Sequence, residues 1–288
     1  MDILEEGDDY MKKILITGAN SYIGTSFENY MKQWSENYKV DTIDMIDGTW
    51  REKDFSAYDV VFHVAGIAHI KETKENAFLY YKVNRDLVYD VAKKAKSESI
   101  KQFIFLSSMS VYGVETGIIS TDTIPAPKSN YGKSKLQAEE LISSLQEPKF
   151  NIAVLRPPMI YGNGCKGNYV RLEKFALKSP IFPDMKNRRS MIYIDNLCEF
   201  VKQIIDNESR GLFLPQNKEY VCTSDMVRDI AEAHGKKIYM TKLFNPLLRL
   251  LKVSTVNKVF GDLVYEQIPS DYDANGSVIV KKSVKTAK

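Results

Sequence analysis

Cysteine is scarce in this chain of 288 residues. Cys165, Cys198 and Cys222 are widely spaced, odd in number and without a C-x-x-C pair. This pattern favours reduced packing residues over a disulfide framework, and it contains no ligand spacing typical of a metal site. We therefore expect no metal centre.

Long apolar runs are missing as well. No stretch approaches the roughly 18 uninterrupted apolar residues of a transmembrane helix, and the N-terminus is acidic where a secretory signal is basic and then apolar. Charge is nearly balanced, with 40 Lys and Arg against 37 Asp and Glu, and the single dense basic run is confined to residues 281–288. We expect that run to be a solvated tail. The composition predicts a globular cytoplasmic protein with neither nucleic acid nor membrane as a partner.

Short apolar, β-branched runs alternate with longer segments of helical periodicity. The predicted strands are residues 14–17, 40–44, 60–66, 103–108 and 151–156. Between the third and fourth, apolar residues recur at helical spacing and predict a crossover helix; they are Val83, Leu87, Val88, Val91, Ala92 and Ala95. Such alternation predicts an α/β fold, a doubly wound parallel sheet of the Rossmann type covered by helices on both faces.

A glycine-containing loop, TGANSYIG at residues 17–24, follows the first predicted strand and opens a helical segment. Backbone N–H groups and the helix dipole at such a turn can hold the pyrophosphate of a dinucleotide. The cofactor-binding residues predicted here are Gly18, Asn20, Ser21, Tyr22, Ile23 and Gly24. Ser21 stands where a third glycine normally lets the dinucleotide approach, so its effect on affinity is an open question. The alternative is an ordinary strand-to-helix turn.

Asp44 ends the second predicted strand, 26 positions after Gly18. A carboxylate at this point accepts hydrogen bonds from the adenosine ribose and repels a 2′-phosphate, so NAD is favoured over NADP. Asp41 and Asp47 flank it, and the choice of Asp44 depends on where the strand is placed. A solvated acid without a ligand is the alternative.

Ser108 and the segment YGKSK at residues 131–135 supply a hydroxyl, a phenol and an ammonium. On a helix, Tyr131 and Lys135 lie on one face. The ammonium and an oxidised nicotinamide would lower the phenol pKa from about 10 toward working pH, which makes Tyr131 a usable base. Ser108 would orient the reacting oxygen. The Y-x-x-x-K spacing alone is common on amphipathic helices, and it is the order of loop, serine and YGKSK that favours a catalytic trio.

After about residue 157 the regular alternation fades among proline and glycine residues, a composition that suits loops closing over a ligand. We predict a flexible extension at residues 1–10 and an NAD-binding Rossmann domain at 11–160. Residues 161–288 are expected to form mainly a smaller substrate-binding region, interleaved with the end of the sheet.

Taken together, these motifs resemble the extended short-chain dehydrogenase/reductase family of nucleotide-sugar epimerases, dehydratases and reductases. The matching segments are TGANSYIG, DVVFHVAG at 59–66, SSMSVYG at 107–113, YGKSK, LRPPMIYG at 155–162 and RRSMIYIDNL at 188–197. By that resemblance the catalytic residues are Ser108, Tyr131 and Lys135, further cofactor contacts are Ala65, Gly66 and Asn84, and substrate contacts are Ser108, Met109, Ser110 and Arg189. Tyr131 and Lys135 are also expected to contact the cofactor.

The resemblance also assigns roles at three further points. Arg189 matches an arginine that contacts the nucleotide diphosphate in such enzymes, and a solvated basic turn with Arg188 is the alternative. His63 is expected to be structural. Relatives form a homodimer through the helix that bears Tyr131 and the neighbouring crossover helix, so a homodimer is expected here.

Two departures from the family pattern bear on the reaction. Dehydratases carry an Asp-Glu pair beside the catalytic hydroxyl, where this chain has Met109 and Ser110, so dehydration is disfavoured. Met159 replaces an asparagine that many relatives use, which leaves the sugar undetermined. The resemblance favours NAD-dependent C4 epimerisation of a UDP-hexose or UDP-N-acetylhexosamine in bacterial surface-polysaccharide synthesis. The alternatives are a reductase of a UDP-4-keto-6-deoxy sugar and, from another class, a non-catalytic dinucleotide sensor.

Overall fold

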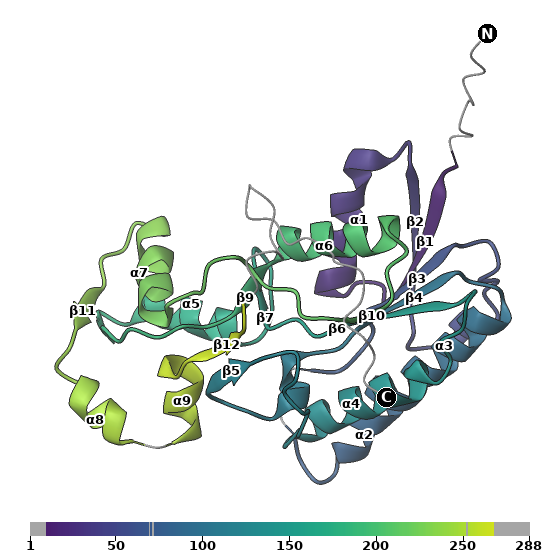
Figure 1. Cartoon of the computed structure of the whole chain (residues 1–288). Helices are drawn as coiled ribbons and strands as arrows, with labels where there is room; N and C mark the ends of the chain where they lie inside the picture. The colour runs from purple at the N-terminus through teal and green to yellow at the C-terminus, as the bar shows by residue number, and fades with distance from the viewer. Residues whose placement is uncertain (1–9, 69, 71, 252, 268–288) are drawn as a thin grey trace.

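The structure is a computed structural model that describes residues 10–68, 70, 72–251 and 253–267 (Figure 1). The predicted extension at residues 1–10, apart from Tyr10, and the basic run at residues 281–288 lie outside the described residues.

A six-stranded sheet with every neighbouring pair parallel forms the centre of the larger lobe, in the order β10-β6-β4-β3-β1-β2. Its strands in chain order are β1 (Lys12–Thr17), β2 (Tyr38–Ile43), β3 (Val60–His63), β4 (Gln102–Leu106), β6 (Asn151–Leu155) and β10 (Gly211–Phe213). The predicted α/β fold with a parallel Rossmann-type sheet is confirmed. The sixth strand, β10, was not predicted, because only three residues form it.

Four predicted strands end earlier than expected, β2 and β6 by one residue, β3 by three and β4 by two. Strand β3 stops at His63, because the N–H groups of Val64 and Ala65 turn back to Thr17 O, at 3.1 and 2.9 Å. Strand β4 stops at Leu106, two residues before Ser108. Both segments leave the sheet at its carboxyl edge, where parallel α/β sheets bind their ligands.

Helices cover both faces of the sheet (Figure 1). Helices α1 (Tyr22–Met31) and α6 (Ile194–Asp206) pack on one face, and α3 (Leu87–Ser97) and α4 (Asn130–Ser143) pack on the other. Alternate residues of β1 enter the two cores, so that Ile14 and Ile16 contact the first layer while Leu15 contacts the second. This explains why the central strands are apolar throughout.

The predicted crossover helix is present, but it is not uniform. Helix α2 (Ala77–Tyr81) passes into a π-helical turn, η3 (Lys82–Asp86), before α3 begins. Such insertions are frequent at functional sites. Asn84 lies in the middle of this turn and is fully buried.

The remaining elements build the smaller lobe, on the left of Figure 1, and its contact with the sheet. Three pairs of short parallel strands are β5 (Gly117–Ile119) with β12 (Leu263–Tyr265), β7 (Met159–Tyr161) with β9 (Met191–Tyr193), and β8 (Ile181–Pro183) with β11 (Tyr239–Thr241). The helices are α5 (Asn168–Lys178), α7 (Thr223–Ala233), α8 (Asn245–Leu250) and α9 (Ser254–Phe260). Outside this lobe, the 3-10 turns η1 (Lys32–Trp34) and η2 (Thr49–Arg51) belong to the larger lobe, and the 3-10 turn η4 (Met109–Tyr112) follows β4.

Candidate active site

The loop between β1 and α1 approaches the backbone after β3 very closely. Gly18 has φ +118°, and a Cβ atom placed there would lie 2.8 Å from Ala65 N. Only glycine fits this conformation and this space without strain. The predicted cofactor residue Ala65 is therefore positioned by direct packing against the loop.

Ser21 adopts a role that the sequence did not suggest. Its φ of −75° is ordinary for any L residue, and its Oγ accepts a hydrogen bond from Gly24 N at 3.1 Å. Ser21 is thus the N-cap of α1, a position where serine is favoured. Its side chain is turned toward the helix that it caps.

Two backbone donors remain available at the start of α1. The N–H groups of Tyr22 and Ile23 have no acceptor in the described part of the chain. The first turn contains no acidic residue, so the positive end of the helix dipole is not neutralised there. Free N–H groups at a helix N-terminus fit a phosphate group. The residues present therefore fit the pyrophosphate of a dinucleotide.

Asp44 follows β2 directly and lies beside this loop. Ile43 O accepts hydrogen bonds from Gly18 N at 2.9 Å and Ala19 N at 3.0 Å, which ties the loop to the end of the strand. One carboxylate oxygen of Asp44 accepts from Ile46 N at 2.6 Å. Its second oxygen has no partner among the described residues and can accept from a ribose hydroxyl.

Ser108 and Tyr131 come from segments that are far apart in sequence. Ser108 is the N-cap of η4 and accepts from Ser110 N at 3.1 Å. Helix α4 approaches η4 so closely that a Cβ atom on Gly132 would lie 2.6 Å from Ser110 O. The glycine of YGKSK is what permits this approach, and the approach places the serine hydroxyl next to the phenol.

The pKa of Tyr131 is subject to opposing influences. Burial raises it above the usual 10.0, and the nearby Tyr80 adds to the increase, whereas a hydrogen bond with Ser108 lowers it. Burial is the largest influence within the chain. No positively charged side chain among the described residues lowers the pKa of Tyr131, so the predicted lowering of this pKa requires a positive charge from another source.

Lys135 lies one helical turn after Tyr131 and is only 5 % exposed. Its Nζ donates to Leu106 O at 2.8 Å and lies 4.7 Å from the ring centroid of Phe105. Burial lowers the pKa of Lys135 to about 8, and the charge of Glu139 partly opposes this effect. The ammonium is therefore held beneath the end of β4 in a poorly solvated position.

Asn84 is occupied with the backbone of the loop after β3. Its Oδ1 accepts from Ile67 N and its Nδ2 donates to Ile67 O, both at 2.9 Å. Both polar atoms of the Asn84 side chain are therefore used to hold the loop after β3. This loop includes Gly66, which is exposed.

His63 is fully buried within β3. Its Nδ1 lies 2.7 Å from Thr17 Oγ1, and its ring stacks on Phe103. Burial lowers the pKa of His63 to about 3, with a smaller contribution from Lys135. A neutral imidazole packed between strands fits the expected structural role.

A buried ion pair, which the sequence analysis did not identify, supports the trio. Glu139 and Arg156 are both less than a tenth exposed, and Arg156 Nε lies 3.1 Å from each Glu139 carboxylate oxygen. Ser107 donates to Glu139, and Arg156 donates to Tyr112 OH at 2.9 Å. The pair fixes α4 against the ends of β4 and β6. Its signal in the sequence is an acid four residues after Lys135, on the same helix face.

Arg189 is a half-buried cation of the smaller lobe that forms no ion pair within the described residues. Its Nη1 donates to Gly261 O at 3.2 Å, and burial lowers its pKa. In the described chain no carboxylate lies within ion-pair distance of it, whereas the neighbouring Arg188 pairs with Asp262 at 3.4 Å. A half-buried guanidinium without a counter-ion favours an anionic ligand such as a diphosphate.

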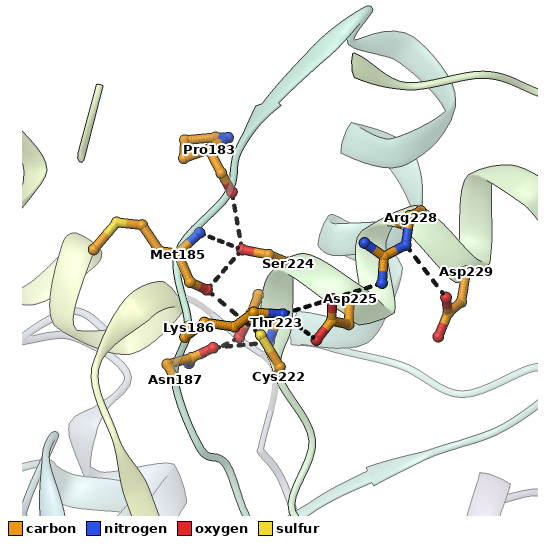
Figure 2. A network of polar contacts seen from close by, with 10 residues as sticks. All are labelled: Pro183, Met185, Lys186, Asn187, Cys222, Thr223, Ser224, Asp225, Arg228 and Asp229. Atoms are coloured by element: carbon orange, nitrogen blue, oxygen red, sulfur yellow. Dashed lines mark hydrogen bonds and ion pairs between the residues drawn. The ribbon is translucent and has the colours of Figure 1, made fainter. Parts of the chain in front are cut away.

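Figure 2 shows the polar network that holds the segment just before Arg189. Ser224 Oγ, at the start of α7, accepts from Met185 N at 3.0 Å and lies 2.9 Å from both Pro183 O and Met185 O. Asn187 Oδ1 accepts from Thr223 N at 2.8 Å. These residues were not predicted, because their partners lie almost 40 positions away.

The segment around Arg189 is also joined to the sheet. Ser190 Oγ accepts from Tyr265 N at 2.8 Å, and Tyr265 OH donates to Arg156 O at 2.6 Å. The structure thus brings Ser108, Tyr131 and Lys135 to one edge of the sheet. Within the described residues, no direct contact connects Arg189 with the trio.

Two kinds of feature are absent from the described residues. The described residues contain no group of three or more His, Cys, Asp or Glu side chains placed so that they could hold a metal ion. None of their helices is long and apolar enough to cross a bilayer.

Comparison with known proteins identifies the family. The model of the NAD dependent epimerase/dehydratase family matches residues 14–214. The UDP-glucose 4-epimerase of Vibrio cholerae is 30% identical over 291 residues, which cover 89% of this chain and 88% of that relative. The N-acetyl-alpha-D-glucosaminyl-diphospho-ditrans,octacis-undecaprenol 4-epimerase of Escherichia coli O157:H7 is 27% identical over 253 residues, covering 81% of this chain and 76% of that relative.

Solved structures show the same fold. MoeE5 in complex with UDP-glucuronic acid and NAD has a TM-score of 0.70 at 17% identity, covering 94% of this chain and 95% of MoeE5. The UDP-glucuronic acid 4-epimerase of Bacillus cereus has a TM-score of 0.65 at 24% identity, covering 80% and 85%. The phosphate loop and the buried lysine of this chain are consistent with these matches. The chain belongs to the NAD dependent epimerase/dehydratase family of extended short-chain dehydrogenase/reductases, with NAD as its cofactor.

Proposed function

We propose that this protein catalyses C4 epimerisation of a UDP-hexose or UDP-N-acetylhexosamine through a 4-keto intermediate. One observation carries the proposal: the close packing of α4 on η4 places the Ser108 hydroxyl beside the Tyr131 phenol. Met109 and Ser110 occupy the position where dehydratases of the family have an acid pair, so no acid stands at that position to expel a hydroxyl.

Each side chain of the trio has a distinct task in this proposal. Tyr131 removes the proton from O4 of the sugar and returns it, and Ser108 holds that oxygen in position. NAD, when bound, supplies the redox chemistry at C4. The buried ammonium of Lys135 binds the ribose of the cofactor, and the oxidised nicotinamide of bound NAD would supply the positive charge that favours the phenolate form of Tyr131.

The phosphate-binding groups set the orientation of the two ligands. The free N–H groups at the start of α1 take the cofactor pyrophosphate, and Asp44 takes the adenosine ribose. Arg189 binds the diphosphate of the sugar nucleotide, which supplies the negative charge that this cation lacks in the chain itself.

The decisive experiment follows cofactor and stereochemistry together. Purified protein is mixed with UDP-GlcNAc, UDP-glucose or a UDP-4-keto-6-deoxy-HexNAc in the presence of NAD or NADH. A C4 epimer formed without net change in nicotinamide absorbance supports the proposal, because an epimerase recycles its cofactor. Stoichiometric loss of NADH on the keto sugar alone would make the protein a reductase. Tight NAD binding with no change in any sugar would indicate a sensor.

Tyr131→Phe tests the residue assignment. We expect the variant to lose turnover by at least about 100-fold while NAD binding is largely retained, since only the phenol oxygen is removed. Tyr89→Phe, on the neighbouring helix α3, is the matched control and should turn over normally. Near wild-type epimerisation by Tyr131→Phe would refute the assignment.

Three other predictions stand beside the reaction as parts of the proposal. They are a cytoplasmic location, a homodimer formed through α4 and its neighbouring helices, and a division of labour between residues 11–160 for the cofactor and 161–288 for the substrate.

A further inference from the structure

The smaller lobe carries an exposed apolar surface around α8, at the far end of the molecule from the sheet (Figure 1). It consists of Leu243, Phe244, Leu247, Leu250, Leu251 and Val253, and we call it the α8 surface. Leu243 and Leu250 are 78 % and 79 % exposed, and Leu247 is 58 % exposed. Large aliphatic side chains gathered in this way mark an interaction site or a membrane-contact site.

The segment that carries the α8 surface is attached to the rest of the lobe by a buried polar residue and a neighbouring strand. Asn245 is buried, and its Nδ2 donates to Asp184 O at 2.8 Å. Strand β11, just before it, pairs with β8. With Asn245 as the buried residue of α8, Leu247 and Leu250 remain exposed to solvent.

Charge identifies the partner that fits this surface. Between Gly235 and Gly261 the sequence has six Lys and Arg residues and no Asp or Glu. Lys242 and Arg249 are exposed, interleaved with the leucines, and neither has an acidic partner in the described part of the chain. Two copies of such a surface would repel each other, whereas an anionic layer with an apolar interior satisfies both its charge and its leucines.

We propose that the α8 surface docks this protein on an anionic phospholipid bilayer, with the leucines in the boundary between headgroups and acyl chains. This departs from the sequence-based expectation of no membrane partner, which was drawn from the lack of long apolar runs and from the basic run at residues 281–288 and did not consider α8. Helix α9 follows α8, and Arg189 donates to Gly261 O at the end of α9. Docking would therefore bring the proposed diphosphate site close to the membrane surface.

Vesicle flotation with the full-length protein tests the proposal. We expect binding to vesicles of phosphatidylcholine with about one third phosphatidylglycerol, little binding to phosphatidylcholine alone, and loss of binding as salt is raised. The double variant Leu243→Ser, Leu250→Ser should bind at least about tenfold more weakly. Lys242→Gln with Arg249→Gln should weaken binding and flatten its salt dependence.

Matched controls separate this proposal from the proposed reaction. Ile124→Ser removes an apolar side chain that is 84 % exposed outside the α8 surface, and it should bind vesicles like the wild type. All variants should keep their activity on a water-soluble sugar nucleotide. Equal binding to neutral and anionic vesicles, no binding to either, or self-association that the leucine variant abolishes would each overturn the proposal, whatever the enzyme assay shows.

Discussion

Replacing Lys135 by methionine should make the protein more stable at neutral pH while removing its activity. The buried ammonium has its pKa lowered from 10.5 to about 8. At about 1.4 kcal/mol per pH unit, burial of the charged form costs about 3 kcal/mol of folding free energy near pH 7. Methionine removes this cost, but it also removes the hydrogen bond from Lys135 to Leu106 O, which contributes about 1 kcal/mol. We therefore expect Lys135→Met to raise the free energy of unfolding by about 2 kcal/mol.

The dependence on pH gives an independent check of this reasoning. Since the folded pKa lies below the unfolded one, the unfolded wild type holds a proton between about pH 8 and 10.5 that the folded wild type has lost. Wild-type stability should rise with pH across that window, because the penalty is complete below it and absent above it. The variant lacks this group, so its advantage should shrink as the pH rises, reach zero before pH 10.5 and give way there to a deficit of about 1 kcal/mol from the lost hydrogen bond.

Urea denaturation at several pH values, followed by circular dichroism, measures the effect. Lys133→Met is the matched control, because Lys133 is exposed on the same helix and should change stability little. Turnover of Lys135→Met should fall by at least about 100-fold. A variant less stable than the wild type near neutral pH, or an advantage that does not change with pH, would refute the view that Lys135 is held at an energetic cost.

Three further predictions concern the phosphate loop and the core. Gly18→Ala should weaken NAD binding by at least about tenfold and lower stability by about 1–3 kcal/mol, because its Cβ would lie 2.8 Å from Ala65 N; a nicotinamide titration with wild-type affinity would contradict this. Ser21→Ala should cost about 1 kcal/mol and Ser21→Gly only a few tenths, since both remove the cap on Gly24 N but glycine is a tolerated cap; equal losses in urea denaturation would exclude capping. His63→Asn should make the protein less sensitive to acid. Between pH 6.5 and about 3 the unfolded wild type binds a proton at His63 that the buried ring does not bind, so wild-type stability decreases as the pH falls through this range. Parallel plots of stability against pH for the two proteins would show that His63 is not responsible.

Much of the larger lobe is fixed by local sequence patterns. Apolar runs predicted five of the six strands of the sheet, and helical spacing from Val83 to Ala95 predicted the crossover helix. The phosphate loop and YGKSK were visible because their residues are close in sequence. The larger errors were at boundaries, at the ends of β3 and β4, and at the short strand β10, where hydrogen bonds to distant segments decide the ends.

The sequence by itself determined the fold class, the family and the cofactor, because periodicity and compact motifs are properties of neighbouring residues. Only the tertiary structure decided which charges have partners. Glu139 and Arg156 neutralise each other in the interior, Arg189 has no counter-ion in the described chain, and Lys135 is desolvated beneath β4. Likewise, leucines look alike in a sequence whether they fill a core or face solvent, as those of the α8 surface do. Burial and pairing depend on residues brought together from distant parts of the chain, and for that reason the energetics of the site follow only from the folded molecule.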